Sequence, residues 1–184
     1  MVVKVETWIG GSTGNPNKVE APAVWFKAAD DPTVLDFSNP ITLPPPDETA
    51  NSQWIYLALS FSGDFESKTV SNIRFFVPFK VDWNVGEGGD VLVGYRGSGD
   101  IGCPEDQYVP PSTEDLETHP FYSGEAEPVR SLNSFTYFTP GTLDSGPYSS
   151  PASSKALVLQ LRIGSDADWG VLEDFPIVFR YDEV

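Results

Sequence analysis

The sequence predicts an all-β fold, an antiparallel β-sandwich with long irregular loops. Apolar residues alternate with small or polar ones in four segments, near residues 55, 75, 159 and 177. A period of two places such side chains on one face of a strand. Apolar residues nowhere keep helical spacing for three turns. Eight or nine strands with long connections between some of them indicate a sandwich, of which a jelly roll is one form.

Turn-forming residues bound most of the expected strands. Gly10, Gly11 and Gly14 end the first strand, and the acidic turn before Pro32 ends the second. The third and fourth strands are expected to form a hairpin through residues 63–68. The expected strands are residues 3–9, 23–28, 53–62, 69–79, 91–96, 129–138, 155–164 and 173–182.

Three long connections separate these strands. Residues 37–51 are rich in proline, which favours an extended crossover on the surface of the domain. Residues 97–128 form the most irregular part, rich in proline and acidic residues, and loops of such length are usually functional or disordered. Within this excursion, Thr113 is expected to cap a single helical turn over 113–118. Residues 139–154 are dominated by Gly, Ser and Pro.

The composition fits one domain over residues 1–184 and excludes several classes of partner. The chain has 27 acidic and 11 basic residues, a net charge of −16. Nucleic-acid binding needs clustered Lys and Arg, and so does docking on an anionic membrane, so neither partner is expected. The acidic surface is interpreted mainly as solubilising. The N-terminal segment lacks the apolar run of a signal peptide, and no stretch has the length of a membrane span.

Groups suited to catalysis are few, and the chain is not expected to be an enzyme. It contains one His, one Cys and one Met. His119 is interpreted as an exposed loop imidazole, since no nucleophile motif accompanies it. Cys103 has no basic neighbour to lower its pKa, so a reactive thiol is not expected. A glycosidase needs two carboxylates across a cleft, and nothing in the sequence selects such a pair.

Two acidic turns are candidates for a calcium site. Calcium is bound by six to eight oxygen ligands, often from loops. However, Asp is common in turns for conformational reasons, and the EF-hand pattern is absent. The favoured interpretation is therefore a solvated acidic turn and no cofactor, with calcium as the alternative. The first turn contains Asp166, Asp168, Glu173 and Asp174, and the second contains Asp100, Glu105 and Asp106.

Several aromatic residues have the opposite parity to the core residues of their strands. If one sheet face displays them, they can stack on sugar rings or bind another protein. If the long loops cover that face, they belong to a second buried layer, and this second interpretation is favoured. The residues are Trp8, Trp25, Trp54, Tyr56 and Phe76.

Three segments carry a family resemblance. The strand SNIRFF (71–76), the segment VWFKAADDPTV (24–34) and the ending VFRYDEV (178–184) resemble small all-β proteins from the structural gene modules of tailed phages and related archaeal viruses. The resemblance covers about a third of the chain in short pieces. It implies a virion component, present in the particle after synthesis in the host cytoplasm: a capsid decoration protein, a head–tail component or a tail-associated protein.

The expected function is therefore non-enzymatic and depends on protein–protein contacts with other virion proteins, in a chain that forms a homo-oligomer. A carbohydrate-binding module that uses surface Trp and Tyr, with or without calcium, is the alternative. For the virion function, the acidic excursion is expected to supply aromatic contacts and a polar rim. The candidate partner-binding residues are Tyr108, Phe121, Tyr122, Glu114, Asp115 and Glu117.

Overall fold

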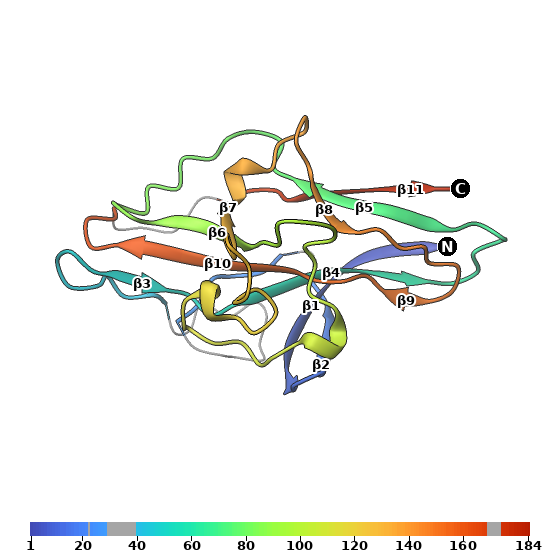
Figure 1. Ribbon diagram of the computed structural model, residues 1–184, viewed down its shortest axis with the longest axis horizontal. Coiled ribbons are helices and arrows are strands. Elements are labelled where there is room, and N and C mark those ends of the chain that lie inside the picture. The colour runs from blue at the N-terminus through green and yellow to red at the C-terminus, as the bar shows by residue number, and fades with distance from the viewer. Residues whose placement is uncertain (22, 29–39, 169–173) are drawn as a thin grey trace.

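Two antiparallel sheets of unequal size form the computed structural model, which describes residues 1–21, 23–28, 40–168 and 174–184 (Figure 1). The larger sheet has the order β2-β1-β4-β10-β6-β7, with β3 paired to β10 and β9 paired to β4. The smaller sheet has the order β11-β5-β8. This arrangement confirms the all-β antiparallel sandwich, although its eight and three strands differ from the eight strands of a jelly roll.

The strands of the larger sheet are β1 (Val2–Ser12), β2 (Asn15–Glu20), β3 (Thr49–Asn51), β4 (Ile55–Ser62), β6 (Asp90–Gly94), β7 (Val129–Ser131), β9 (Ala152–Ser153) and β10 (Leu157–Gly164). Those of the smaller sheet are β5 (Val70–Phe76), β8 (Gly141–Asp144) and β11 (Val178–Glu183). The described residues also form three short 3₁₀ helices, η1 (Glu105–Gln107), η2 (Leu116–Thr118) and η3 (Leu132–Ser134). No helix in this part of the chain has the length and apolar character to cross a membrane.

The main core lies between the two sheets and follows the alternation in the sequence. Leu57, Leu59 and Phe61 of β4 point into it, and Ile73 and Phe75 of β5 meet them from the smaller sheet. Burial of a Leu, Ile or Phe side chain stabilises the fold by about 1.5–3 kcal/mol. The period of two therefore predicted the inward faces of these strands correctly.

A second apolar cluster lies on the outer face of the larger sheet, where residues 97–128 cover it. We call residues 97–128 the loop layer. In Figure 1 its two short helices, η1 and η2, lie on the opposite side of β10 from the smaller sheet, whereas Ile101 and Gly102 at its start donate to carbonyls of β8. Because Tyr122 of the layer packs directly on Gly94 of β6, a Cβ atom at Gly94 would overlap its ring. The sheet contributes Trp8, Trp54, Tyr56, Ala58, Leu92, Ala156 and Val158 to the cluster, and the loop layer contributes Cys103, Tyr108, Leu116 and Tyr122.

Two predictions about the strands in the first half of the chain are wrong. Residues 23–28 form no ladder; the second strand is β2, which folds back on β1 through a turn at Gly14 with φ +71°. Strands β4 and β5 do not form a hairpin, because β4 pairs with β1 and β10 while β5 pairs with β11 and β8. The connection over 63–69 crosses from one sheet to the other.

Other predicted elements are correct only in part. The strand expected over 129–138 ends at Ser131 and continues as η3 and a turn. The expected loop over 139–154 contains β8 and β9, and the last strand begins at Val178. The helical turn near residue 116 is η2, and its cap is Asp115, not Thr113, because the Asp115 carboxylate accepts a hydrogen bond from the Glu117 N–H.

Candidate functional site

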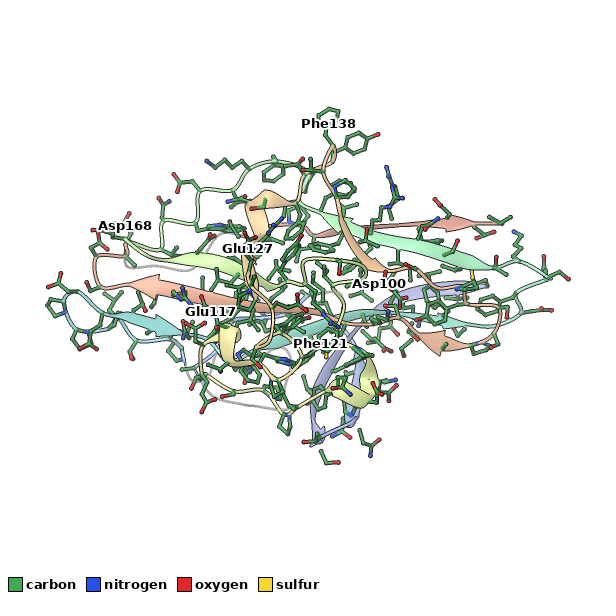
Figure 2. The ribbon with its side chains drawn as sticks, in the orientation of Figure 1. Asp100, Glu117, Phe121, Glu127, Phe138 and Asp168 are labelled. Carbon is green, nitrogen blue, oxygen red and sulfur yellow. The ribbon has the colours of Figure 1, made fainter. Side chains whose placement is uncertain are left out.

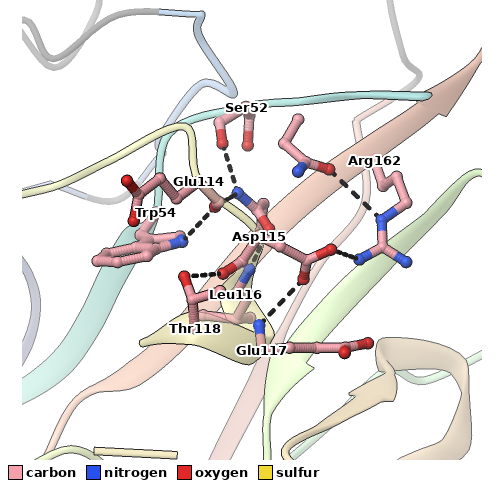
Figure 3. Close-up of polar contacts among 10 residues, drawn as sticks. Ser52, Trp54, Glu114, Asp115, Leu116, Glu117, Thr118 and Arg162 are labelled. Carbon is pink, nitrogen blue, oxygen red and sulfur yellow. Dashed lines mark hydrogen bonds and ion pairs between the residues drawn. The ribbon is translucent and has the colours of Figure 1, made fainter. Parts of the chain in front are cut away.

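Polar contacts hold residues 114–118 of the loop layer against the larger sheet (Figure 3). The buried side-chain amide of Gln160 in β10 makes two of them. Its Nε2 donates to the carbonyl oxygens of Ser52, at 2.8 Å, and Glu114, at 2.7 Å. Its Oε1 accepts the Leu116 N–H at 2.7 Å. The Trp54 indole also donates to the Glu114 carbonyl, at 3.0 Å. Because three of these bonds satisfy the Glu114 carbonyl and the Leu116 N–H of the layer, residues 114–116 are fixed to the sheet.

Further contacts hold the outer rim of the same turn. The Asp115 carboxylate forms an ion pair with Arg162 of β10 and accepts the Glu117 N–H at 3.0 Å. The Thr118 hydroxyl donates to the Asp115 carbonyl at 2.7 Å. The loop layer is therefore an ordered covering of the sheet and not a free extension.

His119 is fully buried inside this layer, so its interpretation as an exposed loop imidazole is wrong. Its Nδ1 accepts the Phe121 N–H at 3.1 Å, which leaves the proton on Nε2. Nε2 then donates to the Tyr56 hydroxyl at 2.8 Å, and that hydroxyl donates to the Val109 carbonyl at 2.9 Å. The ring also lies 4.8 Å from the Trp54 ring between centroids. The imidazole links the sheet to the layer as a neutral group.

Burial lowers the pKa of His119 to about 4, from 6.5 for an unperturbed imidazole, because the charged form would lose its hydration. The unfolded chain therefore binds the proton more tightly than the folded chain. The contribution of neutral His119 to the stability of the fold is fully present above about pH 6.5. It decreases as the pH falls and is lost below about pH 4. The interval between the two pKa values corresponds to about 3 kcal/mol of unfolding free energy.

We expect urea unfolding to show a decrease of about 2 kcal/mol between pH 7 and about pH 5, before most carboxylates titrate. His119→Asn is the matched variant, because an amide oxygen can still accept the Phe121 N–H and does not titrate in this range. The variant should lack most of this decrease. Equal pH slopes for the two proteins would contradict the role assigned to His119.

Two of the candidate partner-binding residues cannot contact a partner in this fold. Tyr108 and Tyr122 are fully buried, and their hydroxyls donate to the carbonyls of Gly10 and Ile101. Their rings complete the second apolar cluster. The sequence does not distinguish aromatic residues that pack on the domain's own sheet from those that bind a partner. Phe121 is half-buried beneath the Arg96 guanidinium, 4.7 Å from the ring centroid.

The acidic candidates of the loop layer lie on its outer surface. Glu114 and Glu117 are exposed, and Asp115 is half-buried in its ion pair with Arg162. These three acidic residues are therefore accessible at the surface of the loop layer.

The aromatic residues of opposite parity confirm the covered-face interpretation. Trp8, Trp54 and Tyr56 are buried beneath the loop layer. Phe76 is buried on the smaller sheet, where the Tyr137 ring packs against it. Trp25 is half-buried. Trp54 is therefore not placed to stack on a sugar.

Among the described residues, the carboxylates of the two acidic turns form no group of three potential metal ligands. Asp166, Asp168 and Asp174 are exposed, and Glu173 lies outside the described residues. Asp166 accepts the Glu87 N–H at 2.7 Å.

In the second acidic turn, Asp100 is paired with Lys155 and Glu105 with Lys18, while Asp106 is exposed. No group of three potential metal ligands is found within the described ranges.

Exposed aromatic side chains gather instead at a turn after η3. Tyr137 is 57% exposed and Phe138 is 89% exposed, and Figure 2 shows Phe138 projecting from the edge of the molecule. Phe79 is 58% exposed. Val77 and Thr136 form a parallel bridge, and Phe79 and Phe138 each follow it by two residues along their own segment. We call Phe79, Tyr137 and Phe138 the aromatic tip.

The backbone that carries the aromatic tip is well fixed. Thr139 N–H donates to the Thr136 carbonyl at 3.1 Å, and the two threonine hydroxyls lie 2.8 Å apart. On the other arm, the Asn133 side chain accepts the Val81 N–H at 3.0 Å and donates to the Val81 carbonyl at 2.8 Å. A contact made by the exposed rings would therefore cost little backbone entropy.

Three cations accompany the aromatic tip: Arg74 of β5, Lys80 and Arg180 of β11. Arg74 and Arg180 are directly opposite in the β5–β11 ladder, and the Arg180 guanidinium lies 6.0 Å from the Tyr137 ring centroid. No ion pair within the described ranges reaches any of the three. By contrast, seven other cations have such pairs: Lys4, Lys18, Lys68, Arg96, Arg130, Lys155 and Arg162.

A shallow cavity of about 300 Å³ lies at the base of the aromatic tip, between residues 95–101 and 134–142. Its cations are already neutralised, Arg96 by Glu125 and Arg130 by Glu127. Arg130 also stacks on Tyr95, 3.8 Å from the ring centroid. The cavity thus offers less unsatisfied charge than the surface formed by the aromatic tip and its three cations, which we call the tip patch.

Sequence reasoning placed Tyr137 and Phe138 in a strand and missed the tip patch. One signal was present: two threonines three residues apart, Thr136 and Thr139, flank the aromatic pair, and Pro140 follows. Hydroxyl residues at this spacing favour a turn over a strand. The arrangement of Arg74 opposite Arg180 depends on strand pairing and has no local signal. No family model, curated protein or solved structure matches this chain.

Proposed function

We propose that this protein is a non-enzymatic structural component of a virus particle, a decoration, head–tail or tail-associated protein, and that it binds its neighbours through the tip patch. The observation that carries the proposal is the exposure of three large aromatic side chains on two fixed segments, together with three cations that no ion pair within the described residues reaches. Aromatic residues and Arg are the side chains most enriched at protein contacts. The position in a virion rests on the resemblance of the segments 24–34, 71–76 and 178–184.

The rest of the described surface supports contact through this patch. The outer face of the larger sheet, which carries Trp8 and Trp54, is sealed by the loop layer. The other large apolar residues that are well exposed, Val2, Val19 and Val184, are aliphatic. A modest contact of this kind is sufficient in a particle, because many copies on a symmetric shell add their contributions.

The test measures incorporation into particles of the virus that encodes the chain. Particles carrying the wild-type chain or Phe79→Ser/Phe138→Ser are purified on a density gradient, and the chain is quantified by mass spectrometry. Truncation of a contact hot spot costs about 2 kcal/mol or more, which is roughly thirty-fold in affinity, so we expect the double variant to be largely absent.

Val184→Ser is the matched control, because this side chain is 82% exposed and lies outside the tip patch. It should be incorporated like the wild type. Two results would overturn the proposal: absence of the wild-type chain from particles, or wild-type incorporation of the double variant with its fold intact by circular dichroism.

A further inference from the structure

The cations of the tip patch are suited to a partner that supplies carboxylates. Like charges directly opposite on neighbouring strands are destabilising, and Arg74 and Arg180 are such a pair. Lys80 adds a third cation next to Phe79. A carboxylate placed between the two guanidinium groups would replace repulsion by charge-assisted hydrogen bonds. The nearest acidic residue along β11, Asp182, accepts a hydrogen bond from Asn72 at 2.8 Å.

The chain itself presents carboxylates of the required kind on the loop layer. Glu114 and Glu117 are exposed, and no ion pair in the described part of the chain reaches them. Their backbone is fixed, because Gln160 and Trp54 bind the Glu114 carbonyl and Asp115 caps the Glu117 N–H. A rigid acidic surface can meet a rigid cationic one with little loss of conformational entropy.

The two surfaces cannot meet within one molecule. The tip patch belongs to the side of the smaller sheet, whereas the loop layer covers the opposite face of the larger sheet. Figure 2 shows Phe138 and Glu117 well apart. A contact between these two surfaces therefore needs two copies, and such a contact is heterologous, so that each added copy leaves one surface of each kind free.

We propose that the tip patch of one copy binds the outer surface of the loop layer of a second copy, around Glu114 and Glu117, in a head-to-tail homo-oligomer. This inference rests on the proposed function, because assembly in a particle supplies the local concentration. The net charge of −16 opposes association at long range, and salt near 0.15 M screens it beyond about 8 Å. The short-range pairs between Arg180, Arg74 and the glutamates act within that distance.

The experiment measures the weight-average mass of the purified chain by sedimentation equilibrium over a range of concentrations. The wild type should exceed the monomer mass as its concentration rises. Arg180→Glu and Glu117→Lys should each weaken self-association by tenfold or more, because each places like charges across the contact. The combined variant, Arg180→Glu with Glu117→Lys, exchanges the two charges and should regain association.

Lys4→Glu and Glu48→Lys are the matched controls, because they change the net charge equally at exposed positions outside both surfaces. Both should associate like the wild type. A wild type that stays monomeric at every concentration overturns the inference, as does a failure of Arg180→Glu, of Glu117→Lys or of the combined variant to behave as stated.

The two proposals can fail separately. A monomeric wild type that still enters particles through the aromatic tip would overturn self-association and leave another acidic virion protein as the partner. Self-association without incorporation into particles would overturn the proposed function and support the contact between copies.

Discussion

Replacement of residues 101–127 by a short Gly/Ser linker is expected to abolish cooperative folding. The linker would uncover Trp8, Trp54, Tyr56 and Val158 on the outer face of the larger sheet. Exposing one large apolar side chain costs about 1.5–3 kcal/mol, so the four together cost about 6–12 kcal/mol. This is comparable with the whole net stability of a domain, which is about 5–15 kcal/mol. The variant should show no cooperative urea transition and should aggregate.

The matched control replaces exposed side chains on the other side of the molecule. Tyr137→Gly/Phe138→Ser replaces two side chains of the aromatic tip, both more than half exposed, and should unfold cooperatively. Size-exclusion chromatography, binding of a hydrophobic dye and near-ultraviolet circular dichroism compare the two variants. A linker variant that is monomeric and unfolds cooperatively would show that the loop layer is dispensable for the fold.

The inward faces of the strands could be predicted because they depend on a local property. Successive side chains of a strand point to opposite faces, so Leu57, Leu59 and Phe61 reveal the core side of β4 without any knowledge of its neighbours. The same parity placed Trp8, Trp54 and Tyr56 on the other face. The prediction that long loops cover that face was correct because large aromatic side chains on both faces require two coverings.

Strand partners could not be predicted in the same way. A short turn-like segment separates strands β4 and β5. A segment of this length can connect two paired strands in a hairpin, and it can equally connect strands in two different sheets. The pairing of Arg74 with Arg180 joins residues that are distant along the chain, so the cationic part of the tip patch had no local signal. His119 was placed at the surface for a similar reason, since only folding brings Tyr56 to its Nε2.

Gln160→Leu is expected to destabilise the fold by about 2–6 kcal/mol, because a buried backbone group that loses its partner costs about 1–3 kcal/mol. The leucine has a similar volume but would leave the Ser52 carbonyl and the Leu116 N–H without the amide that they bind. The Glu114 carbonyl would keep its bond from the Trp54 indole. Urea unfolding at pH 7 measures the loss of stability, and hydrogen exchange should show faster opening of the loop layer at residue 116.

Arg162→Gln provides the comparison that assigns the effect to the buried amide. Arg162 lies two residues further along β10 and binds the same turn through Asp115, but this ion pair is partly exposed. Such pairs contribute about 0–1 kcal/mol, so this variant should lie close to the wild type. At this turn the buried amide therefore contributes more than the ion pair, because a neutral group satisfies buried backbone atoms without the cost of desolvating a charge. Equal destabilisation by the two variants, or a Gln160→Leu protein as stable as the wild type, would contradict this division of roles.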